Sequence, residues 1–245
     1  MEARPAQQYP SQLRRKLERL RYLYRHGGVT GLLFYLFYRL VNRFTRLRVF
    51  RMAIMDAGAP IDAQLGRLEA YRHGLFKPAE LEPYVDDPEN ALTREFLDYA
   101  ATQGDTCYAT FEGDTLVSYC WNSDKPTLIE DDLHIEFRKG YIYRYKEYTR
   151  TSHRGRRLTS FARAESLRLF AATDVKGFAG YVEADNFVSY RALQRANHLF
   201  PGFIVVLGKG PAPWIWHSPG AREWGFRVLS TPPALNVPSA IKSYS

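Results

Sequence analysis

Apolar residues recur at helical spacing near the start of the chain and predict a helix over residues 12–25, with arginines around its apolar stripe. Consecutive glycines at 27 and 28 are expected to break it. A second helix is predicted over residues 29–51, whose first ten residues carry no charge. A membrane-spanning helix needs about 20 apolar residues. Arg39 ends the uncharged run after ten residues, so the segment is too short to span a membrane. The pattern is typical of a helix lying in the membrane interface. A helix packed on the domain, with its arginines in water, is the alternative.

The pattern changes after residue 55. Residues 56–105 are interpreted as a link, a proline-punctuated stretch and a helix near 91–103. The segment DTCYATFEGDTLVSYCW then predicts a hairpin that turns at Gly113-Asp114. With a two-residue turn, Cys107 is expected to face Cys120 across the hairpin. Two reduced, half-buried thiols are favoured over a disulfide.

Further strands and helices alternate to the end of the chain. LHIEF and YIYRYKEYTR predict a second hairpin that turns at residues 138–140, and a helix follows over about 155–172. KGFAGYVEA predicts a strand, NFVSYRALQRAN a helix and FPGFIVVLGKG another strand, with a last strand within residues 213–229. This order predicts a mixed α+β fold in which helices pack on a mixed sheet, and it excludes an alternating doubly wound fold.

Charge is concentrated near the N-terminus. Residues 11–51 carry eleven Lys or Arg and one acid, so this segment has a net charge of +10, and the rest of a chain of total charge +8 has −2. A nucleic-acid groove over the whole body is therefore not expected. Aromatic residues do interleave with the N-terminal arginines, as stacking platforms would require, but the apolar stripe there is too continuous for a solvated arm. The two cysteines suit a reducing, cytoplasmic compartment.

One junction between a predicted strand and a predicted helix concentrates positive charge. The chain runs through the sequence RGRRLT from Arg154 to Thr159. A helix N-terminus exposes unpaired N–H groups and carries partial positive charge, and a glycine lets a phosphate approach the backbone. Ser152 and Thr159 are available as further donors. The junction therefore predicts a site for a phosphorylated ligand, with an exposed arginine-rich turn as the alternative.

The chain resembles the GNAT superfamily of acyl-CoA-dependent N-acyltransferases at this junction. The family pattern is Arg/Gln-x-x-Gly-x-Gly/Ala after the fourth strand. Arg154 and Gly155 match the common Arg-Gly form, whereas Arg157 and Thr159 replace the two later small residues. The resemblance implies a central, mostly antiparallel twisted sheet with helices on both faces. It also implies an acyl-CoA co-substrate held by Tyr148, Thr149, Arg154, Gly155, Arg156, Arg157, Leu158 and Thr159.

A second part of the resemblance lies downstream. Family members follow the fifth strand with an asparagine and a helix, which here correspond to Asn186 and a helix ending near Asn197; Ser189 completes the implied coenzyme contacts. Asn197 replaces the usual glycine and also tolerates a left-handed backbone. The helix tyrosine that serves many members as general acid aligns with Leu193. Tyr190, three residues earlier, is the substitute.

The resemblance also implies where a general base would lie. The fourth strand of the family splays from the fifth and pairs with the pantetheine arm, which places Glu147 and Thr149 on the same side by period two. Glu147 is the first candidate base for an ammonium acceptor, and a cross-strand partner of Arg or Lys is its alternative role. Glu183, at the end of the fifth strand, is the second candidate. His134 and His153 are expected to be structural or exposed, and no residue spacing indicates a metal site.

The predicted function is direct transfer of an acyl group, such as acetyl, from acetyl-CoA or another acyl-CoA to an amine. Residues 1–55 would form a basic amphipathic helical extension, 56–229 the acyltransferase domain and 230–245 a flexible tail. The extension, through residues 11–51, would hold the domain at the inner membrane face, near an envelope, polysaccharide or lipid-linked acceptor. A long-chain donor on an acyl carrier protein and a non-catalytic GNAT-like binding module are the alternatives.

Overall fold

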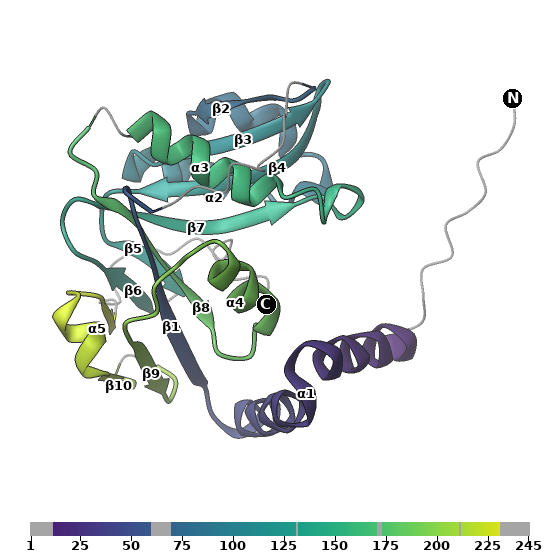
Figure 1. Ribbon diagram of the computed structural model, residues 1–245, viewed down its shortest axis with the longest axis vertical. Helices are drawn as coiled ribbons and strands as arrows, with labels where there is room; N and C mark the ends of the chain where they lie inside the picture. Colours follow the sequence, from purple (N-terminus) through teal and green to yellow (C-terminus); the bar gives the residue numbers. More distant parts are fainter. Residues whose placement is uncertain (1–11, 60–69, 131, 171–172, 211, 231–245) are drawn as a thin grey trace, which may run out of the picture.

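Two sheets organise the part of the chain that the computed structural model describes, residues 12–59, 70–130, 132–170, 173–210 and 212–230 (Figure 1). The strands are β1 (Leu47–Asp56), β2 (Arg72–Phe76), β3 (Thr106–Glu112), β4 (Thr115–Ser123), β5 (Thr127–Glu130), β6 (Leu133–Glu136), β7 (Tyr141–Thr149), β8 (Gly177–Glu183), β9 (Phe203–Leu207), β10 (Trp214–His217) and β11 (Arg227–Ser230). The larger sheet has the order β10-β9-β1-β8-β7-β4-β3-β2, and the smaller has the order β11-β6-β5. In the larger sheet, β7 and β8 are parallel and the other neighbouring strands are antiparallel, so this sheet is mixed but mostly antiparallel.

Helices cover both faces of the larger sheet, as predicted (Figure 1). They are α1 (Gln12–Phe44), α2 (Arg94–Gln103), α3 (Leu158–Phe170), α4 (Phe187–Arg195) and α5 (Pro219–Glu223), with short 3₁₀ turns η1 (Pro78–Tyr84), η2 (Pro88–Asn90) and η3 (Thr151–His153). The principal core lies between the sheet, α2 and the smaller sheet, where Phe96, Trp121 and Ile135 are fully buried. A smaller cluster, which includes Ile142 and Leu167, lies beneath α3 on the opposite face. The predicted mixed α+β class is confirmed.

The N-terminal boundary of the domain was predicted in the wrong place. Residues 47–51 are not the end of a helix, because β1 begins at Leu47 and lies inside the larger sheet, between β8 and β9. Phe50, Met52 and Ile54 of β1 are buried in the principal core. The run LRVFRMAIMD is apolar enough for either a helix or a central strand, and pairing with two distant strands decides for the strand. The body of the protein therefore includes residues that were assigned to the extension.

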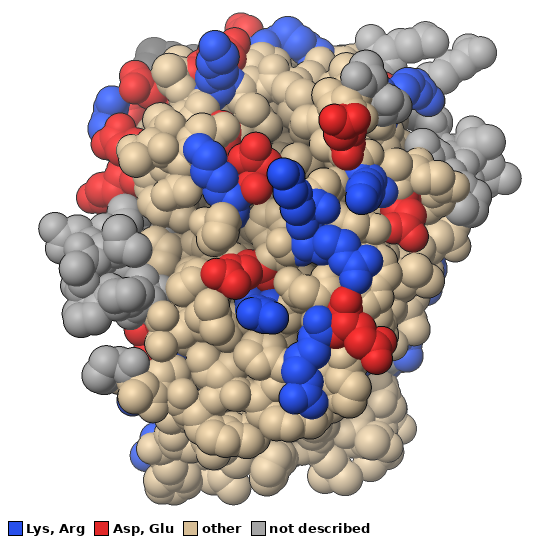
Figure 2. All heavy atoms as spheres, turned by 90° about the vertical axis from the view of Figure 1, so that its left-hand side faces the viewer, with Lys and Arg blue, Asp and Glu red and all other residues tan. Residues whose placement is uncertain are grey.

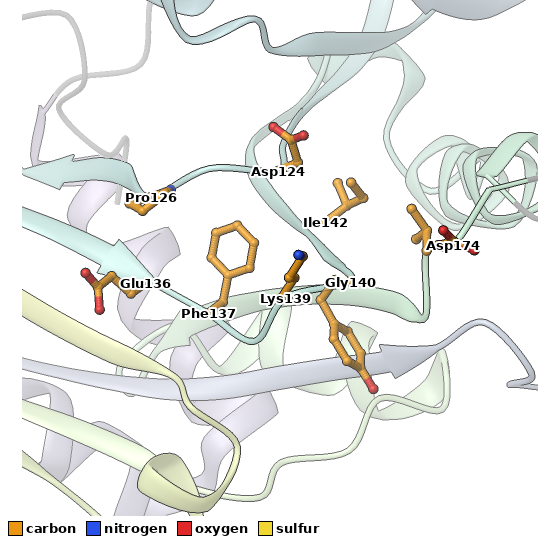
Figure 3. A pocket seen from close by; sticks show the side chains of 10 residues that line it. Asp124, Pro126, Glu136, Phe137, Lys139, Gly140, Ile142 and Asp174 are labelled. Atoms are coloured by element: carbon orange, nitrogen blue, oxygen red, sulfur yellow. The ribbon is translucent and has the colours of Figure 1, made fainter.

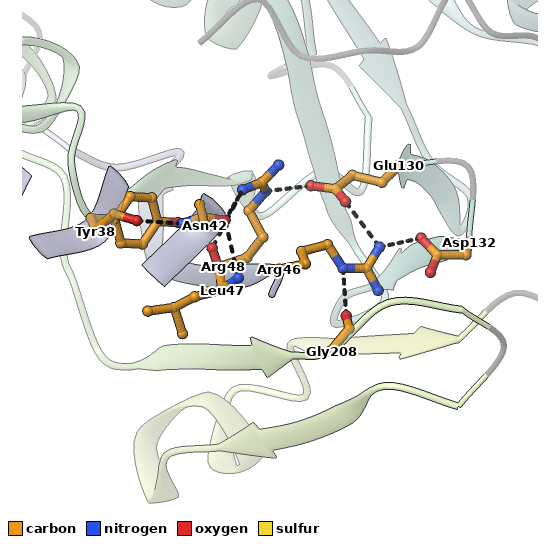
Figure 4. Close-up of polar contacts among 8 residues, drawn as sticks. All are labelled: Tyr38, Asn42, Arg46, Leu47, Arg48, Glu130, Asp132 and Gly208. Carbon is orange, nitrogen blue, oxygen red and sulfur yellow. Dashed lines mark hydrogen bonds and ion pairs between the residues drawn. The ribbon is translucent and has the colours of Figure 1, made fainter. Parts of the chain in front are cut away.

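Two arginines of this segment do not face a membrane surface. Figure 4 shows Arg46 and Arg48 pointing toward the turn that joins β5 and β6. Arg46 Nη1 lies 3.2 Å from Glu130 Oε2 and 2.5 Å from Asp132 Oδ1, and Arg48 Nε lies 2.6 Å from Glu130 Oε1. Arg46 Nε also donates to the Gly208 carbonyl oxygen at 2.8 Å. These charges fasten β1 to the smaller sheet and to the end of β9.

The first predicted hairpin is confirmed, but its cysteines do not face each other. Glu112 pairs with Thr115 as expected, yet the register shifts between Thr110 and Phe111. Tyr108 is consequently opposite Cys120, and Cys107 is opposite Trp121. A one-residue slip moves a side chain to the other face of a sheet. The two thiols therefore lie on opposite faces, free and buried.

The second predicted hairpin is wrong. The strand β6 pairs with β5 and β11 in the smaller sheet, whereas β7 pairs with β4 and β8. The interpretation of residues 56–105 as a link, a proline-punctuated stretch and a helix also missed the edge strand β2, which pairs with β3. Periodicity predicted that these strands exist, but their partners depend on contacts between distant parts of the chain. The helix predicted near 91–103 is confirmed as α2, and the tail from residue 231 lies outside the described residues.

The long helix α1 bends at the predicted glycines. Gly28 has φ +64° and ψ −164°, which separates two helical halves. The second half packs against α4, where the ring of Phe187 lies against Gly27 and Gly31. Tyr35 and Tyr38 of this half are buried, and so is Leu23 of the first half. No helix within the described ranges has the length and apolar character needed to cross a bilayer.

Candidate active site

The strands β7 and β8 run together for a short distance only. Their parallel pairing joins Tyr141 to Gly177 and ends with Tyr143 opposite Ala179, although β7 continues to Thr149 and β8 to Glu183. The carboxyl-terminal halves of these neighbouring strands are therefore not paired with each other. This is the separation that the sequence resemblance implied for the fourth and fifth strands.

A bulge redirects the second half of β7. The pairing with β4 shifts between Tyr119 and Trp121, and Lys146 has a left-handed φ of +47°. After the bulge, Glu147 Oε1 lies 3.7 Å from the thiol of Cys120, and Thr149 Oγ1 lies 3.1 Å from the hydroxyl of Ser118. Cys120 and Ser118 are two residues apart in β4, so their side chains lie on the same face of the sheet. Glu147 and Thr149 thus share the face covered by α3, as expected.

The arginine-glycine junction is a tight turn that leads into α3. Gly155 has φ +81°, and a Cβ atom added there would meet nothing within 4 Å, so this glycine borders open space. Arg157 has φ +58° at a position where the family pattern has glycine. The first bond of α3 runs from Phe161 N–H to the Arg157 carbonyl. The N–H groups at the start of α3, before this bond, have no partner within the helix, as at any helix N-terminus.

The side chains of the turn have different surroundings. Arg154 folds back, and its Nε donates to the Thr149 carbonyl at 3.3 Å. Arg156 donates to the Tyr71 hydroxyl at 2.7 Å and lies 3.6 Å from Glu112. Both arginines and Arg157 are exposed, whereas Leu158 is buried and anchors the helix start. The turn thus combines exposed positive charge with a fixed backbone.

Two further residues near this turn are placed by the structure. Tyr148 stacks on Tyr119 with ring centres 5.2 Å apart, and burial raises the pKa of its hydroxyl. That hydroxyl is buried without a hydrogen-bond partner among the described residues. Thr159 lies half-buried in the first turn of α3. His153 is buried and bonded to Glu112 at 3.0 Å, which is a structural role.

Glu147 is held by two arginines. Arg163 of α3 binds its carboxylate through two nitrogens, at 3.2 and 2.5 Å, and Arg144 Nε lies 3.6 Å from Oε1. Burial raises the pKa of this carboxyl, but the charges of Arg163 and Arg144 outweigh burial and leave the pKa below its ordinary value. A carboxylate held in the ionised form in this way is a weak base.

Glu183 has the opposite environment. It lies opposite Phe50 of β1 and therefore on the face of the principal core. Burial raises the pKa of its carboxyl to about 7, with Arg48 acting against the shift and the acids Asp185 and Glu130 adding to it. A carboxyl of this pKa is suited to accept a proton near neutral pH. Of the two predicted bases, Glu183 has the better electrostatic surroundings.

The helix α4 carries the other predicted residues. Asn186 caps it by accepting a hydrogen bond from Ser189 N–H at 3.1 Å, so this pair shapes the helix start. Asn197 has φ +56°, which confirms the left-handed backbone. The Tyr190 hydroxyl accepts from Gln194 Nε2 at 3.1 Å, and the guanidinium of Arg51 lies 4.7 Å from the centre of the Tyr190 ring. Tyr190 and Arg51 border a shallow hollow of about 430 Å³.

A second hollow lies away from all of these residues. It measures about 480 Å³ and lies at the start of β7, the strand end opposite to the arginine-glycine turn. Figure 3 shows its wall, formed by Asp124, Glu136, Phe137, Lys139 and Asp174. None of the predicted site residues lines it. Within the described ranges, no group of His, Cys, Asp and Glu is arranged to hold a metal ion.

Several residues of the candidate site were not foreseen from the sequence. Arg144 and Arg163 surround Glu147, Arg48 and Tyr38 lie near Glu183, and Arg51 covers Tyr190. Arg144 stands between tyrosines in the apolar first half of β7. A charged residue inside an apolar strand is rarely buried unless it has a partner, so this position indicated a buried, paired arginine. The other contacts join distant elements and leave no local pattern.

Comparison with protein-family models and with curated proteins finds no match to this chain. Solved structures with a similar arrangement include a GCN5-related N-acetyltransferase from Sphaerobacter thermophilus, with a TM-score of 0.49 and 17% identity over 70% of this chain and 55% of that one. A tandem GNAT protein from the clavulanic acid biosynthesis pathway matches with a TM-score of 0.46 and 12% identity, over 77% of this chain and 55% of that one. A conserved protein of unknown function from Staphylococcus epidermidis matches with a TM-score of 0.47 and 10% identity, over 69% of this chain and 64% of that one.

These similar structures include members of the family whose motifs the sequence resembles. The chain spans 55–64% of the length of the three proteins. At identities of 10–17%, the assignment of an activity depends on the residues of this chain themselves.

Proposed function

We propose that this protein is an acyl-CoA-dependent N-acyltransferase that moves an acyl group, such as acetyl, from a thioester directly to an amine. One observation carries the proposal. The strand β7 parts from β8 and then runs, through the glycine turn, into the N-terminus of α3. This arrangement provides an extended backbone edge and, at its end, a set of N–H groups with partial positive charge.

The residues of the turn fit a pyrophosphate. The first-turn N–H groups of α3 would donate to it, the open space beside Gly155 would admit it, and Arg154, Arg156 and Arg157 would supply exposed charge. Coenzyme A would supply the acyl group as an activated thioester. Arg157, which replaces the glycine of the family pattern, has the left-handed φ of +58° that glycine favours, so the turn would keep the backbone shape that the pattern requires.

Proton transfer is assigned to Glu183 and Tyr190. Glu183 would accept a proton from the ammonium form of the acceptor, because its raised pKa of about 7 makes it both available and basic enough at neutral pH. Tyr190, the substitute for the usual helix tyrosine, would donate a proton to the leaving thiolate. Backbone N–H groups of β7 would polarise the thioester carbonyl. Glu147 would hold Arg163 and Arg144 rather than act as the base.

The exposed face of α1 supports a location at an anionic membrane surface. A stripe of large apolar residues at helical spacing on its second half is 49–78% exposed: Val29, Leu33, Leu36, Phe37, Leu40 and Phe44. Arg21, Arg25, Arg39 and Arg43 are exposed on the same helix, and no acid occurs between residues 19 and 55. Such a helix gains affinity for anionic lipid from both apolar burial and charge. The acceptor would then be a lipid-linked, envelope or polysaccharide precursor that carries an amine.

The end of the larger sheet extends this apolar surface. Figure 2 shows few charged side chains at the lower end of the face that it presents, over β9 and β10. Phe203, Leu207, Trp214 and Trp216 of these strands are 37–57% exposed. Tryptophan favours the boundary between lipid and water. We therefore include β9 and β10 in the proposed membrane-facing surface.

Calorimetric titration of the full chain with acetyl-CoA and with CoA tests the activity. We expect micromolar binding that weakens about tenfold in Arg156→Ala, since a lost charge-assisted contact to phosphate is worth about 1.5 kcal/mol or more. Arg168→Ala, which removes an exposed arginine from the other end of α3, is the matched control. A folded chain that binds neither ligand would refute the proposal.

A pelleting assay with anionic and neutral vesicles tests the location. We expect the full chain to pellet with anionic vesicles, and Phe37→Glu to abolish this, because the substitution places a charge within the apolar stripe of α1. Leu169→Glu changes an apolar residue on α3 that is 50% exposed, against 57% for Phe37, and should have no effect. Equal pelleting of the two variants would remove α1 from the membrane-facing surface.

A non-catalytic binding module is the second candidate. It is favoured by the side chains of Arg154 and Arg156, which already bond to Thr149 and Tyr71 of the same chain. This candidate predicts a folded protein that binds lipid but neither acetyl-CoA nor CoA. A donor carried by an acyl carrier protein is distinguished by binding of that carrier in the same titration.

A further inference from the structure

Arg144 is a buried cation without a hydrogen-bond acceptor in the described part of the chain. Its side chain is 5% exposed, and none of its three guanidinium nitrogens has a hydrogen-bond partner there. The ion-pair contact to Glu147 Oε1, at 3.6 Å, is longer than a hydrogen bond. The guanidinium instead lies over the ring of Phe178, 4.7 Å from its centre. Arg144 is the first residue of β7 beyond the last pair with β8.

The neighbours of Arg144 leave one positive charge without a counter-ion. Arg163 takes both oxygens of Glu147, so one carboxylate serves two guanidinium groups. Cys120 contacts Arg144 through its sulfur, which is only a weak acceptor. It does not supply a second anion, because burial raises the pKa of its thiol to about 12 against the charge and contact of Arg144. His198 adds no charge either, since burial and the charge of Arg163 lower its pKa to about 4. The cluster therefore has a net charge of +1 at neutral pH.

A second unfilled polar atom lies at the same place. Asn122 of β4 is opposite Arg144 in the sheet, and its side-chain oxygen is buried without a partner in the described residues. Buried polar groups in proteins are almost always bonded to protein, water or ligand. A buried guanidinium without an acceptor costs much more than a neutral group does. These orphaned atoms indicate that the cluster is completed by something other than this part of the chain.

We propose that Arg144 is the centre of a binding site for the carboxylate group of a ligand. One surplus charge matches a monoanion, and a phosphate dianion would exceed it. A planar guanidinium also binds a carboxylate through two parallel hydrogen bonds. Glu147, whose side chain is 31% exposed, is more exposed than Arg144 and Arg163, so the ligand would enter beside it.

The carboxylate has two possible carriers, and choosing between them rests on the proposed function. It belongs either to a dicarboxylic acyl group on the thioester or to an amino acid-like acceptor that carries its amine and carboxylate together. In both cases the site adds specificity, because a neutral analogue would leave the Arg144 donors unpaired. The site itself does not depend on acyl transfer.

Arginine Nε–Hε signals in ¹H–¹⁵N NMR spectra of the full chain test the site directly. The Arg144 signal is identified by its absence in Arg144→Lys, which keeps the positive charge; the remaining signals of the spectrum check that the variant is folded. Sodium acetate is titrated against sodium chloride and inorganic phosphate at equal ionic strength. We expect acetate to shift the Arg144 signal in a saturable way, and chloride to leave it unchanged. Arg168 of α3, whose exposed guanidinium pairs with Glu165, provides the internal control signal.

Two matched pairs of ligands then identify the carrier by calorimetry. Succinyl-CoA against butyryl-CoA tests the acyl group, and glycine against glycinamide tests the acceptor. We expect one carboxylated member to bind about tenfold more tightly than its neutral partner, and the preference to vanish in Arg144→Lys, since a bond to a charged group is worth about 1.5–3 kcal/mol.

The outcomes separate this site from the proposed function. An acetate response in a protein that binds no CoA ligand supports the site and refutes the acyltransferase. CoA binding with an Arg144 signal that responds to no carboxylate overturns the site and leaves the acyltransferase standing. A phosphate response as strong as that to acetate overturns the assignment to a carboxylate.

Discussion

Glu147 and Glu183 stand near the ends of two neighbouring parallel strands, yet their carboxyl groups have pKa shifts of opposite sign. Both carboxyl groups are taken partly out of water, and burial alone would raise the pKa of each. Glu147 lies beneath α3, where two arginines reverse the effect. Glu183 lies on the other face, where Arg48 opposes burial and two further acids reinforce it. The comparison shows that the charged partners, more than the strand position, decide which carboxylate is able to take a proton.

Replacement of Glu183 provides the largest expected effect. If Glu183 is the general base, Glu183→Gln should lower kcat/KM for acyl transfer about a hundredfold or more, because base catalysis contributes about 10²–10⁴-fold. The unfolding free energy of Glu183→Gln should not fall, because the uncharged amide buries no charge at this position. Rates are measured by release of free CoA thiol, and stability by urea denaturation. A variant with full activity would remove Glu183 from the mechanism.

Replacement of Glu147 should act on stability instead. Glu147→Gln leaves Arg163 and Arg144 buried without a carboxylate, and since Glu147 itself is 31% exposed, the loss should cost about 1–3 kcal/mol. The unfolding free energy is measured in urea at pH 7. Glu165→Gln is the control, because its partner Arg168 is 70% exposed and such a pair contributes less than about 1 kcal/mol. If the two variants lost equal unfolding free energy, Arg163 and Arg144 would not stabilise the protein through Glu147.

The pH dependence of stability distinguishes the two carboxyls further. The folded pKa of Glu183, about 7, lies above the ordinary value, so the folded state binds the extra proton between about pH 4.5 and 7. Stability from this group is therefore present at acidic pH and is lost as the pH rises to 7. Relative to the wild type, Glu183→Gln should become more stable by the order of 1–2 kcal/mol between pH 5 and 8.

Glu147 should show the opposite sign. Its folded pKa lies below the ordinary value, so its contribution is present above pH 4.5 and is lost as the pH falls through the folded pKa. The deficit of Glu147→Gln against the wild type should thus shrink only in acid. Urea denaturation at a series of pH values measures both curves. Parallel curves for the two variants would mean that the environments do not differ as described.

The sequence predicted a substantial part of the candidate site but not its division of roles. Gly155 was expected to let a ligand approach the backbone, and it borders open space; Asn197 was expected to tolerate a left-handed backbone, and it adopts one. The patterns of β7, β8, α3 and α4 were also readable, because helix and strand periodicity is local. The choice between Glu147 and Glu183 was not readable, since Arg163 and Arg48 come from other elements.

By itself, the sequence determined the mixed α+β class, the basic apolar N-terminal segment and the arginine-glycine junction before a helix. Each of these depends on neighbouring residues alone. Only the tertiary structure decided that residues 47–56 form a strand between β8 and β9, that a bulge puts Cys107 and Cys120 on opposite faces, and that Arg144 is buried without an acceptor in the described chain. Strand pairing and charge burial are energies of contact between distant segments, and no local pattern encodes them.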